Sequence, residues 1–164
     1  LHPRVRRQRQ MCIRDRYGNI EEVIDWSETA RQHYRQDHVA RIVPDYIWYR
    51  SGFTWSRITS YKASFRVQPD YMLFEMTGLT LFVNAVENIP YMLGLMNSKV
   101  AEYLLGIITQ VMTIQLRDVQ AIPVINDKSN YQVCSAYAES NVNLSKTDWD
   151  SYETSWDFKR NPLV

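Results

Sequence analysis

Glycine is scarce in this chain of 164 residues. Its five glycines are dispersed, and no two of them form a G-x-G pattern. Loops that hold dinucleotides or nucleotide phosphates need closely spaced glycines, because their backbone must approach the phosphates. The sequence therefore shows no sign of a nucleotide-cofactor loop.

Cysteine and long apolar runs are also sparse. Cys12 lies in an unusual N-terminal stretch, so only Cys134 remains, and one thiol makes neither a disulfide framework nor a metal cluster. A lone thiol fits a reducing cytosol. The longest apolar run, 103–112, is interrupted by Thr109 and Gln110 and is too short to span a bilayer. We therefore expect a cytoplasmic protein without a membrane segment.

The first residues do not resemble natural protein sequence. The run Arg6–Asp15 resembles, residue for residue, the translation of CGT CGG CAG CGT CAG ATG TGT ATA AGA GAC, a transposase adapter of DNA sequencing libraries. We predict that residues 1–16 are an adapter artefact and leave them out of the fold argument. The alternative is a basic arm that binds nucleic acid.

Without those residues the chain is mildly acidic. They hold six of the 19 basic and one of the 18 acidic residues, which leaves 13 basic and 17 acidic side chains and a net charge of −4. Bulk charge then gives no argument for nucleic-acid binding, and any DNA contact must come from a local patch.

The polar segment 17–40 predicts a linker or a short helix. Ser27 is a suitable N-cap, because its hydroxyl can accept a hydrogen bond from a free amide of the first helical turn.

Residues 41–85 predict a sheet. Aromatic and β-branched stretches alternate there with turn signals at Ser51-Gly52, Pro69-Asp70 and Thr77-Gly78. The alternation is typical of a sheet with one solvent-facing side. The strands are expected at 47–49, 53–55, 64–67, 71–74 and 79–83.

A helix is expected over 88–109, with Pro90 in its first turn. Apolar residues recur there at three- and four-residue spacing and form one stripe: Leu93, Met96, Val100, Tyr103, Leu104 and Ile107. The next segment, 113–119, predicts a strand or an extended turn. From residue 139 the composition shifts to Ser, Asn, Asp and Trp, which indicates a hinge or a docking segment.

Several stretches carry family motifs. They are Gly52-Phe53-Thr54-Trp55, the sheet segment from Phe65 to Phe82, Leu93-Gly94-Leu95-Met96-Asn97-Ser98-Lys99, the exit from Thr113 to Val124, and Ser145–Phe158. Together these stretches resemble the recognition region of PglX-type adenine-specific DNA methyltransferases of BREX phage-defence systems. Related Type IIG enzymes and Type I specificity subunits share the asparagine-serine-lysine helix, whereas 145–158 is the most specific stretch.

The resemblance implies an α+β domain of the TaqI-like target-recognition type, with a small mixed or antiparallel sheet and a packed amphipathic helix. It implies a bacterial or archaeal parent enzyme that transfers a methyl group from S-adenosylmethionine to adenine. Double-stranded DNA, a missing methyltransferase domain in cis and other defence-system subunits would be its partners. The resemblance divides the chain into a linker (17–40), a recognition domain (41–138) and a hinge or docking segment (139–164) before a missing downstream region.

The chemistry itself is not expected in this chain. An adenine methyltransferase needs a cofactor loop and an Asn/Asp-Pro-Pro-Tyr/Phe loop for the extruded base. Asn88-Ile89-Pro90-Tyr91 has isoleucine where the first proline belongs, and we interpret it as a helix start with Asn88 as cap. We therefore expect a non-catalytic fragment that holds no cofactor or metal of its own.

Residues 41–70 carry a local excess of basic side chains, with five Lys or Arg and two Asp. Arginine and lysine bind phosphates, and hydroxyl-bearing side chains can donate to phosphates or base edges. Composition alone favours a solvated sheet face, and the resemblance favours a DNA-reading loop. The candidate DNA-binding residues are Arg50, Trp55, Arg57, Thr59, Ser60, Tyr61, Lys62, Arg66 and Arg117.

Other candidate sites are weaker. His33 and His38 are five residues apart and do not share a helix face. Asp70 and Glu75 lack the lysine of a nuclease motif, since Thr77 stands in its place. The aromatic spacing of 149, 152 and 156 predicts a docking helix within an acidic run. A protein-interaction module and the recognition domain of a Type IIG restriction-modification enzyme therefore stay open as alternatives.

Overall fold

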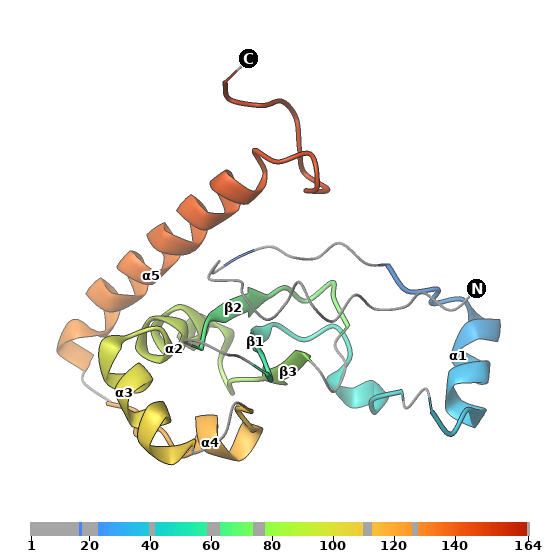
Figure 1. Cartoon of the computed structure of the whole chain (residues 1–164), viewed down its shortest axis with the longest axis horizontal. Coiled ribbons are helices and arrows are strands. Elements are labelled where there is room, and N and C mark those ends of the chain that lie inside the picture. Colours follow the sequence, from blue (N-terminus) through green and yellow to red (C-terminus); the bar gives the residue numbers. More distant parts are fainter. Residues whose placement is uncertain are drawn as a thin grey trace.

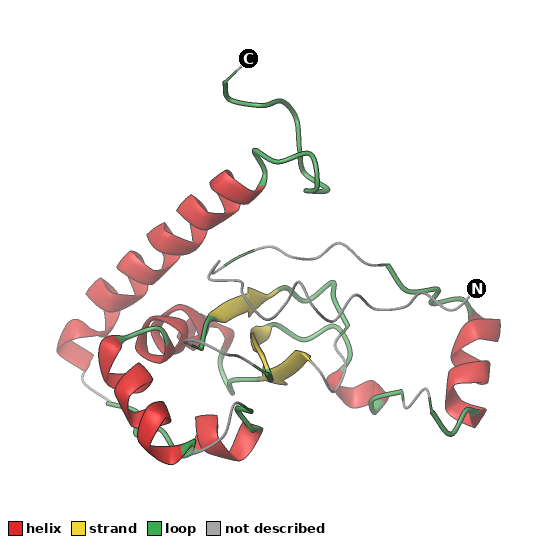
Figure 2. Ribbon diagram, viewed as in Figure 1, coloured by secondary structure: helices red, strands yellow, loops and turns green. Residues whose placement is uncertain are grey.

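A computed structural model describes residues 17, 23–39, 42–58, 63–73, 78–109, 113–125 and 128–163. A small sheet lies at the centre, helices gather beside it, and α5 leads away from it (Figures 1 and 2). The predicted α+β class with a small antiparallel sheet is confirmed. In chain order the elements are α1 (Glu28–Gln36), η2 (Asp45–Ile47), β1 (Gly52–Ser56), β2 (Phe65–Gln68), β3 (Gly78–Leu81), η3 (Val86–Asn88), α2 (Ile89–Met96), α3 (Lys99–Ile108), α4 (Leu116–Gln120) and α5 (Lys128–Trp149).

The sheet has the strand order β2-β1-β3, and both pairings are antiparallel. Because side chains alternate between the two faces of a strand, one face carries the aromatic residues and the other the polar ones. Thr54 of β1 stands opposite both Arg66 and Thr80 on the polar face. The predicted alternation is therefore present, although Arg66 and Thr80 are themselves buried.

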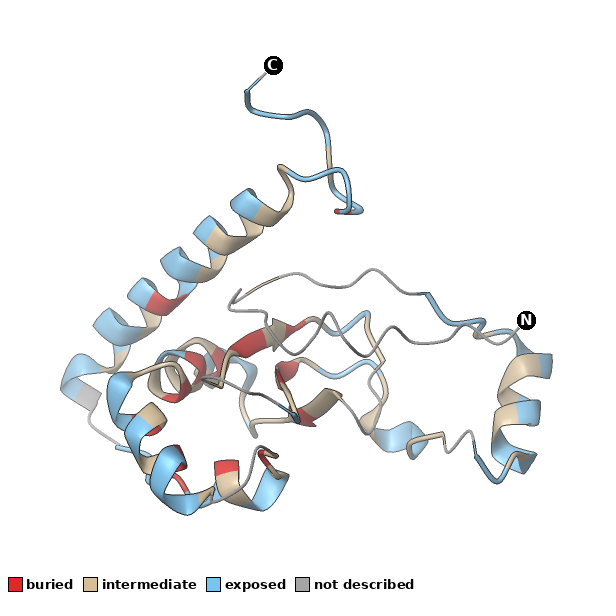
Figure 3. Ribbon diagram, viewed as in Figure 1, coloured by how far each residue is buried: buried red, intermediate tan, exposed pale blue. Residues whose placement is uncertain are grey.

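The apolar face of the sheet forms the core. Phe53, Trp55 and Phe65 are fully buried, and their ring centroids lie 5.6 to 6.4 Å apart. Residues from the helices complete this core: Leu93 and Met96 of α2, Ala101 and Leu105 of α3, and Val119 of α4. Figure 3 shows buried residues on the sheet and on the sides of these helices that face it.

The single helix predicted over 88–109 is wrong, because the chain breaks at Asn97 into α2 and α3. The Asn97 side chain leaves the helix pattern to bond β2: its Oδ1 accepts from the amide of Phe65 at 3.2 Å, and its Nδ2 donates to the Phe65 carbonyl at 3.0 Å. Ser98 then caps α3 by accepting from the amide of Ala101 at 3.2 Å. The break turns α3, so Val100, Tyr103 and Ile107 are exposed and do not belong to one core stripe.

The strand or extended turn predicted over 113–119 is also wrong for its second half, which is α4. A capping box stabilises the short helix, because the Gln115 amide donates to the Asp118 carboxylate at 2.8 Å and the Gln115 side chain accepts in return. Thr113 keeps one extended contact, an antiparallel bridge to Ile58.

Two predicted strands are not formed in the described residues. Segment 47–49 lies at the end of η2 and in a turn, where Tyr49 adopts a positive φ of 53°. Residues 71–73 form no strand, and Phe74 lies outside the described residues. The helix capped by Ser27 is confirmed as α1, and the Ser27 hydroxyl accepts from the Ala30 amide at 3.3 Å.

The last helix differs most from expectation. α5 runs without interruption through the predicted boundary between 138 and 139, and it ends at Trp149, so Tyr152 and Trp156 lie in turns. Its first half packs on α2, where Ala138 is buried and its Cβ lies 3.4 Å from the position that a Cβ on Gly94 would occupy. Among the described residues, no helix is long and apolar enough to cross a membrane.

Candidate nucleic-acid interface

The basic candidates do not form one patch. Arg57 follows the last residue of β1, and its carbonyl accepts a hydrogen bond from the amide of Ile114 at 2.8 Å. This bond brings the segment that leads to Arg117 beside the end of β1. The start of β2 lies at the same end, and the bonds between Phe65 and Asn97 bring the exposed Lys99 near it. We call Arg57, Lys99 and Arg117 the basic end of the sheet.

The cations of the basic end are available for an anionic partner. The side chain of Arg117 is 86% exposed, and its ion pair with Asp118 at 3.6 Å lies in solvent, where such pairs are weak. The Nε of Arg57 is buried and has no hydrogen-bond partner among the described residues.

Four predicted contacts lie between Arg57 and β2. Thr59, Ser60, Tyr61 and Lys62 are outside the described residues, so their role stays a prediction. The described residues on either side of them, Ile58 after β1 and Ala63 before β2, lie at the basic end.

The prediction of Trp55 as a DNA contact is wrong. Its side chain is fully buried in the core, and its Nε1 donates to the carbonyl of Ile114 at 3.2 Å. Arg66 is not a surface cation either, since it is 7% exposed and donates to the Ser56 hydroxyl at 3.2 Å across the polar face of the sheet. Both residues fix the sheet that carries the basic end.

Arg50 lies at the opposite end of the sheet. It precedes β1, whose first residues pair with the end of β3, and its guanidinium lies 5.1 Å from the centre of the Phe82 ring. Arg50 is exposed, so it faces a different part of the surface from Arg57 and Arg117.

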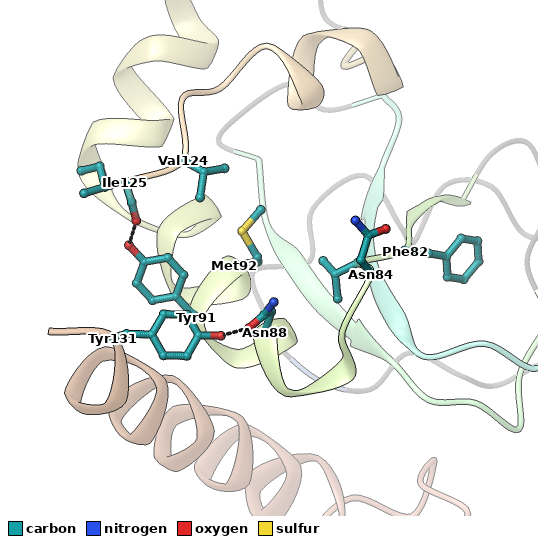
Figure 4. Close-up of a pocket in the computed structure, with 9 residues that line it drawn as sticks. Phe82, Asn84, Asn88, Tyr91, Met92, Val124, Ile125 and Tyr131 are labelled. Atoms are coloured by element: carbon teal, nitrogen blue, oxygen red, sulfur yellow. Dashed lines mark hydrogen bonds between the residues drawn. The ribbon is translucent and has the colours of Figure 1, made fainter. Parts of the chain in front are cut away.

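A groove of about 520 Å³ begins at Phe82 and runs to the start of α5. Phe82, Val83, Asn84, Asn88, Tyr91, Met92, Val124, Ile125 and Tyr131 line it (Figure 4). At one end Tyr91 and Tyr131 stack with ring centroids 4.6 Å apart. Their hydroxyls are bonded: that of Tyr91 donates to the Ile125 carbonyl, and that of Tyr131 donates to Oδ1 of Asn88.

The groove also includes part of the segment Asn88-Ile89-Pro90-Tyr91, which resembles the base-binding loop of a methyltransferase except for isoleucine in place of the first proline. Asn88 is at the N-cap position of α2 and Pro90 lies in the first turn, so the predicted helix start is confirmed. The expected capping bond of the Asn88 side chain is wrong, because Tyr131 occupies its Oδ1. Sequence reasoning missed Tyr131, which lies about forty residues away and gave no local signal.

The motif 145–158 spans the last residues of α5 and a hook that follows the helix. Lys146 donates to Asp150 at 2.6 Å and to Asp157 at 2.7 Å, and the Ser155 hydroxyl donates to Asp150 at 2.6 Å. The Lys146 ammonium also lies 5.0 Å from the centre of the Tyr17 ring. These contacts fold the chain back on the end of α5, and the hydrogen bonds that Lys146 donates to the two aspartates raise its pKa.

The hook should open in acid. Burial raises the pKa of Asp150, but bonds from Lys146 and Ser155 outweigh it and hold the pKa below the ordinary 3.8. A lowered folded-state pKa stabilises the hook above pH 3.8 and loses that contribution as the pH falls through the lowered value. The Asp157 amide donates to Ser155 Oγ and reports on the hook. We expect its hydrogen-exchange protection factor to fall as the pH drops through the lowered pKa of Asp150.

Lys146→Met is the matching variant, since it removes the cation that both aspartates share. We expect low protection of the Asp157 amide at every pH in this variant, and Lys99→Met, at an exposed position at the start of α3, serves as control. Equal protection at about pH 5 and about pH 2 in the unaltered chain would contradict this account of the hook.

The weaker candidate sites gain no support. In the described part of the chain, no group of three or more His, Cys, Asp and Glu side chains could hold a metal ion. His33 lies 3.9 Å from Asp37 in a solvent-exposed pair. Glu75 and Thr77 of the discounted nuclease motif are outside the described residues.

Comparison with known proteins finds two similar methyltransferases. No protein-family model matches the chain. The adenine-specific methyltransferase BrxX of Escherichia coli O9:H4 (strain HS) is 29% identical over 154 residues, which are 93% of this chain and 12% of BrxX. The adenine-specific methyltransferase PglX of Lacticaseibacillus casei (strain Zhang) is 30% identical over 159 residues, again 93% of this chain and 13% of PglX. The chain is a PglX-type relative.

The similarity covers nearly all of the chain and a small part of each methyltransferase. The PglX-type chain spans about an eighth of the length of these curated relatives, 12% of one and 13% of the other. The alignments cover 93% of the chain that carries the basic end, the groove and the hook.

Proposed function

We propose that this PglX-type chain is the DNA-recognition part of an adenine-specific DNA methyltransferase in phage defence. The observation that carries the proposal is the bond between Arg57 and Ile114, which brings the segment leading to Arg117 to the end of β1 where Arg57 lies. A sheet that presents cations at one end suits duplex DNA, because contacts from cations to phosphates position a protein on the duplex.

In this proposal the rest of the enzyme does the chemistry. A methyltransferase domain in cis would bind S-adenosylmethionine and the target adenine, and this chain would supply the target sequence preference. The TaqI-like type of the recognition domain and a cytoplasmic setting belong to the same proposal. The similarity to two adenine-specific methyltransferases supports it.

Removing one phosphate-binding cation should lower the salt dependence of duplex binding. We expect Arg117→Ala to weaken binding uniformly across sequences and to reduce the slope of log affinity against log salt by about 1. An electrophoretic shift assay on the full chain at several salt concentrations measures the slope. Residues 1–16 contribute equally to both proteins, so the difference between them reports on Arg117.

Arg160→Ala is the matched control, because Arg160 is an exposed arginine of the tail and lies outside the basic end. The proposal predicts an unchanged slope for this control. Equal slopes for Arg117→Ala and the unaltered chain would exclude Arg117 as a phosphate contact and remove the main support for the basic end.

A second candidate function is protein docking through the hook. Tyr152 is 56% and Trp156 70% exposed, and they lie among acidic residues such as Asp148 and Glu153. Exposed aromatic side chains are enriched at protein interfaces. Loss of a protein partner in Trp156→Ala, with duplex binding kept, would favour docking over recognition.

A further inference from the structure

The helix α5 has apolar residues on two opposite faces. Ala138 is buried against α2 and Val142 packs against the core, so both belong to the inner face. Val133, Tyr137 and Leu144 lie on the opposite side of the helix, since residues four and seven positions apart share one face. Their side chains are 53%, 70% and 66% exposed. We call these three residues the outer face of α5.

The sequence of α5 does not suit a helix with one side in solvent. Between Lys128 and Lys146 its only charged residue is Glu139, so ion pairs at four-residue spacing do not support that stretch. Ser, Asn and Val make up nine of its 22 residues, and these residues have low helix propensity. Most helical stability in proteins comes from packing and not from propensity. The outer face is therefore expected to pack against another element.

The outer face has the shape of a seam between two helices. Its spacings of four and seven residues are those of side chains that meet a neighbouring helix along one line. Ser140 lies on the same line between Tyr137 and Leu144, and its small side chain lets a neighbouring helix approach closely. The line from Val133 to Leu144 carries no charged residue, as is usual at the centre of an interface. An apolar face of another helix fits this surface.

The two relatives indicate where such a helix comes from. Each alignment covers 93% of this chain, and the part left out is shorter than the stretch after Trp149, so α5 lies within the matched part. The match is 12% of BrxX and 13% of PglX, so most of each relative lies outside it. A second copy of this chain fits less well, because a stable dimer buries about 800 Å² on each partner and the outer face offers three apolar side chains. A partner in the same chain needs a smaller surface, since the covalent link raises its effective concentration.

We propose that the outer face of α5 docks onto an apolar face of a helix from the part of the parent methyltransferase that lies outside this chain. α5 leads away from the sheet (Figure 1), so a partner bound along it fixes the position of the sheet relative to the rest of the enzyme. The proposal shares with the proposed function only the parent enzyme in cis. It does not depend on DNA binding by the sheet, because the outer face and the basic end have no residue in common.

Thiol labelling compares the outer face in this chain and in a whole enzyme of the family. Tyr137→Cys and Leu144→Cys are made in this chain, after Cys12 and Cys134 have been changed to serine, and at the aligned positions of whole PglX from Lacticaseibacillus casei. Glu139→Cys is the matched control, because Glu139 is exposed on the side of α5 and not on its outer face. Mass spectrometry of the labelled peptides measures the rate at each position, and a thermal melt shows that each variant is folded.

We expect the two outer-face cysteines to react about tenfold more slowly in whole PglX than in this chain, because a thiol covered by another helix is shielded from the reagent. The control cysteine should react at the same rate in both proteins. Outer-face cysteines that react as fast in PglX as in this chain would overturn the proposal.

A photocrosslinker identifies what covers the outer face. p-Benzoylphenylalanine at the PglX position aligned with Tyr137 should link to a peptide outside the 159 matched residues. A link between two PglX molecules would point to a second copy, and a link within the matched residues to this chain itself, and either result would contradict the proposal. Sedimentation of the unaltered chain provides a test without cysteine variants: we expect a monomer, whereas a dimer that Leu144→Asp dissociates would also contradict it. Duplex binding is measured separately, so its loss leaves these results unaffected.

Discussion

Trp55→Ala is expected to remove a large part of the stability of the domain. The indole is fully buried, packs on Phe53 and Phe65, and donates to the Ile114 carbonyl that joins β1 to the segment before α4. Truncating a buried tryptophan costs about 3 to 5 kcal/mol, because it removes buried area and leaves a cavity. Domains are stable by about 5 to 15 kcal/mol, so the folded population of the variant should fall steeply.

Urea denaturation followed by circular dichroism measures this loss. Trp156→Ala is the matched control, because that tryptophan is 70% exposed and its removal should change the unfolding free energy by less than about 0.5 kcal/mol. Trp55→Ala with normal stability and weakened DNA binding would restore the interpretation of Trp55 as a DNA contact and contradict its place in the core.

Asn97→Ala is expected to cost about 2 to 3 kcal/mol. The side chain makes hydrogen bonds to both backbone groups of Phe65 and to the Leu93 carbonyl, at 3.0 to 3.2 Å. Each bond contributes about 0.5 to 1.5 kcal/mol, and the amide and carbonyl of the buried Phe65 would be left without partners. A thermal melt should show a midpoint lower by about 5 to 10 °C for a chain of this size.

Two variants separate this role from simple loss of an asparagine. Asn97→Asp keeps the acceptor for the Phe65 amide but sets a carboxylate oxygen against the Phe65 and Leu93 carbonyls, so its stability should be no higher than that of Asn97→Ala. Asn141→Ala, at an exposed position of α5, should have little effect. A melting midpoint for Asn97→Ala equal to that of Asn141→Ala would mean that the bonds to β2 contribute nothing.

The sequence predicted the features that depend on short-range periodicity. Strands at 53–55 and 64–67 follow from alternating aromatic residues, and the cap of α1 follows from Ser27. The same alternation also indicates that Trp55 is buried. Trp55 is two residues from Phe53, so both must face the same side of the strand, and an apolar neighbour on that face predicts burial.

The features that failed depend on contacts distant in sequence. Asn97 fits a helix pattern, and only its partner Phe65, thirty-two residues away, explains why the helix breaks. The clustering of Arg57 with Arg117, and the separation of Arg50 from both, follow from strand pairing that local patterns do not contain. α4 was missed for a different reason: the capping box of Gln115 and Asp118 was readable, but the β-branched residues around it favoured a strand.

The bonds between Asn97 and β2 have a consequence for solubility. β2 lies at the edge of the sheet, and an edge strand exposes backbone groups that can pair with a strand from another molecule. Outward-facing groups belong to alternate residues, so in this four-residue strand they fall on Phe65 and Val67. The Asn97 amide occupies both groups of Phe65 as a neighbouring strand would, so within the four described residues of β2 only Val67 keeps outward-facing groups for pairing with another molecule.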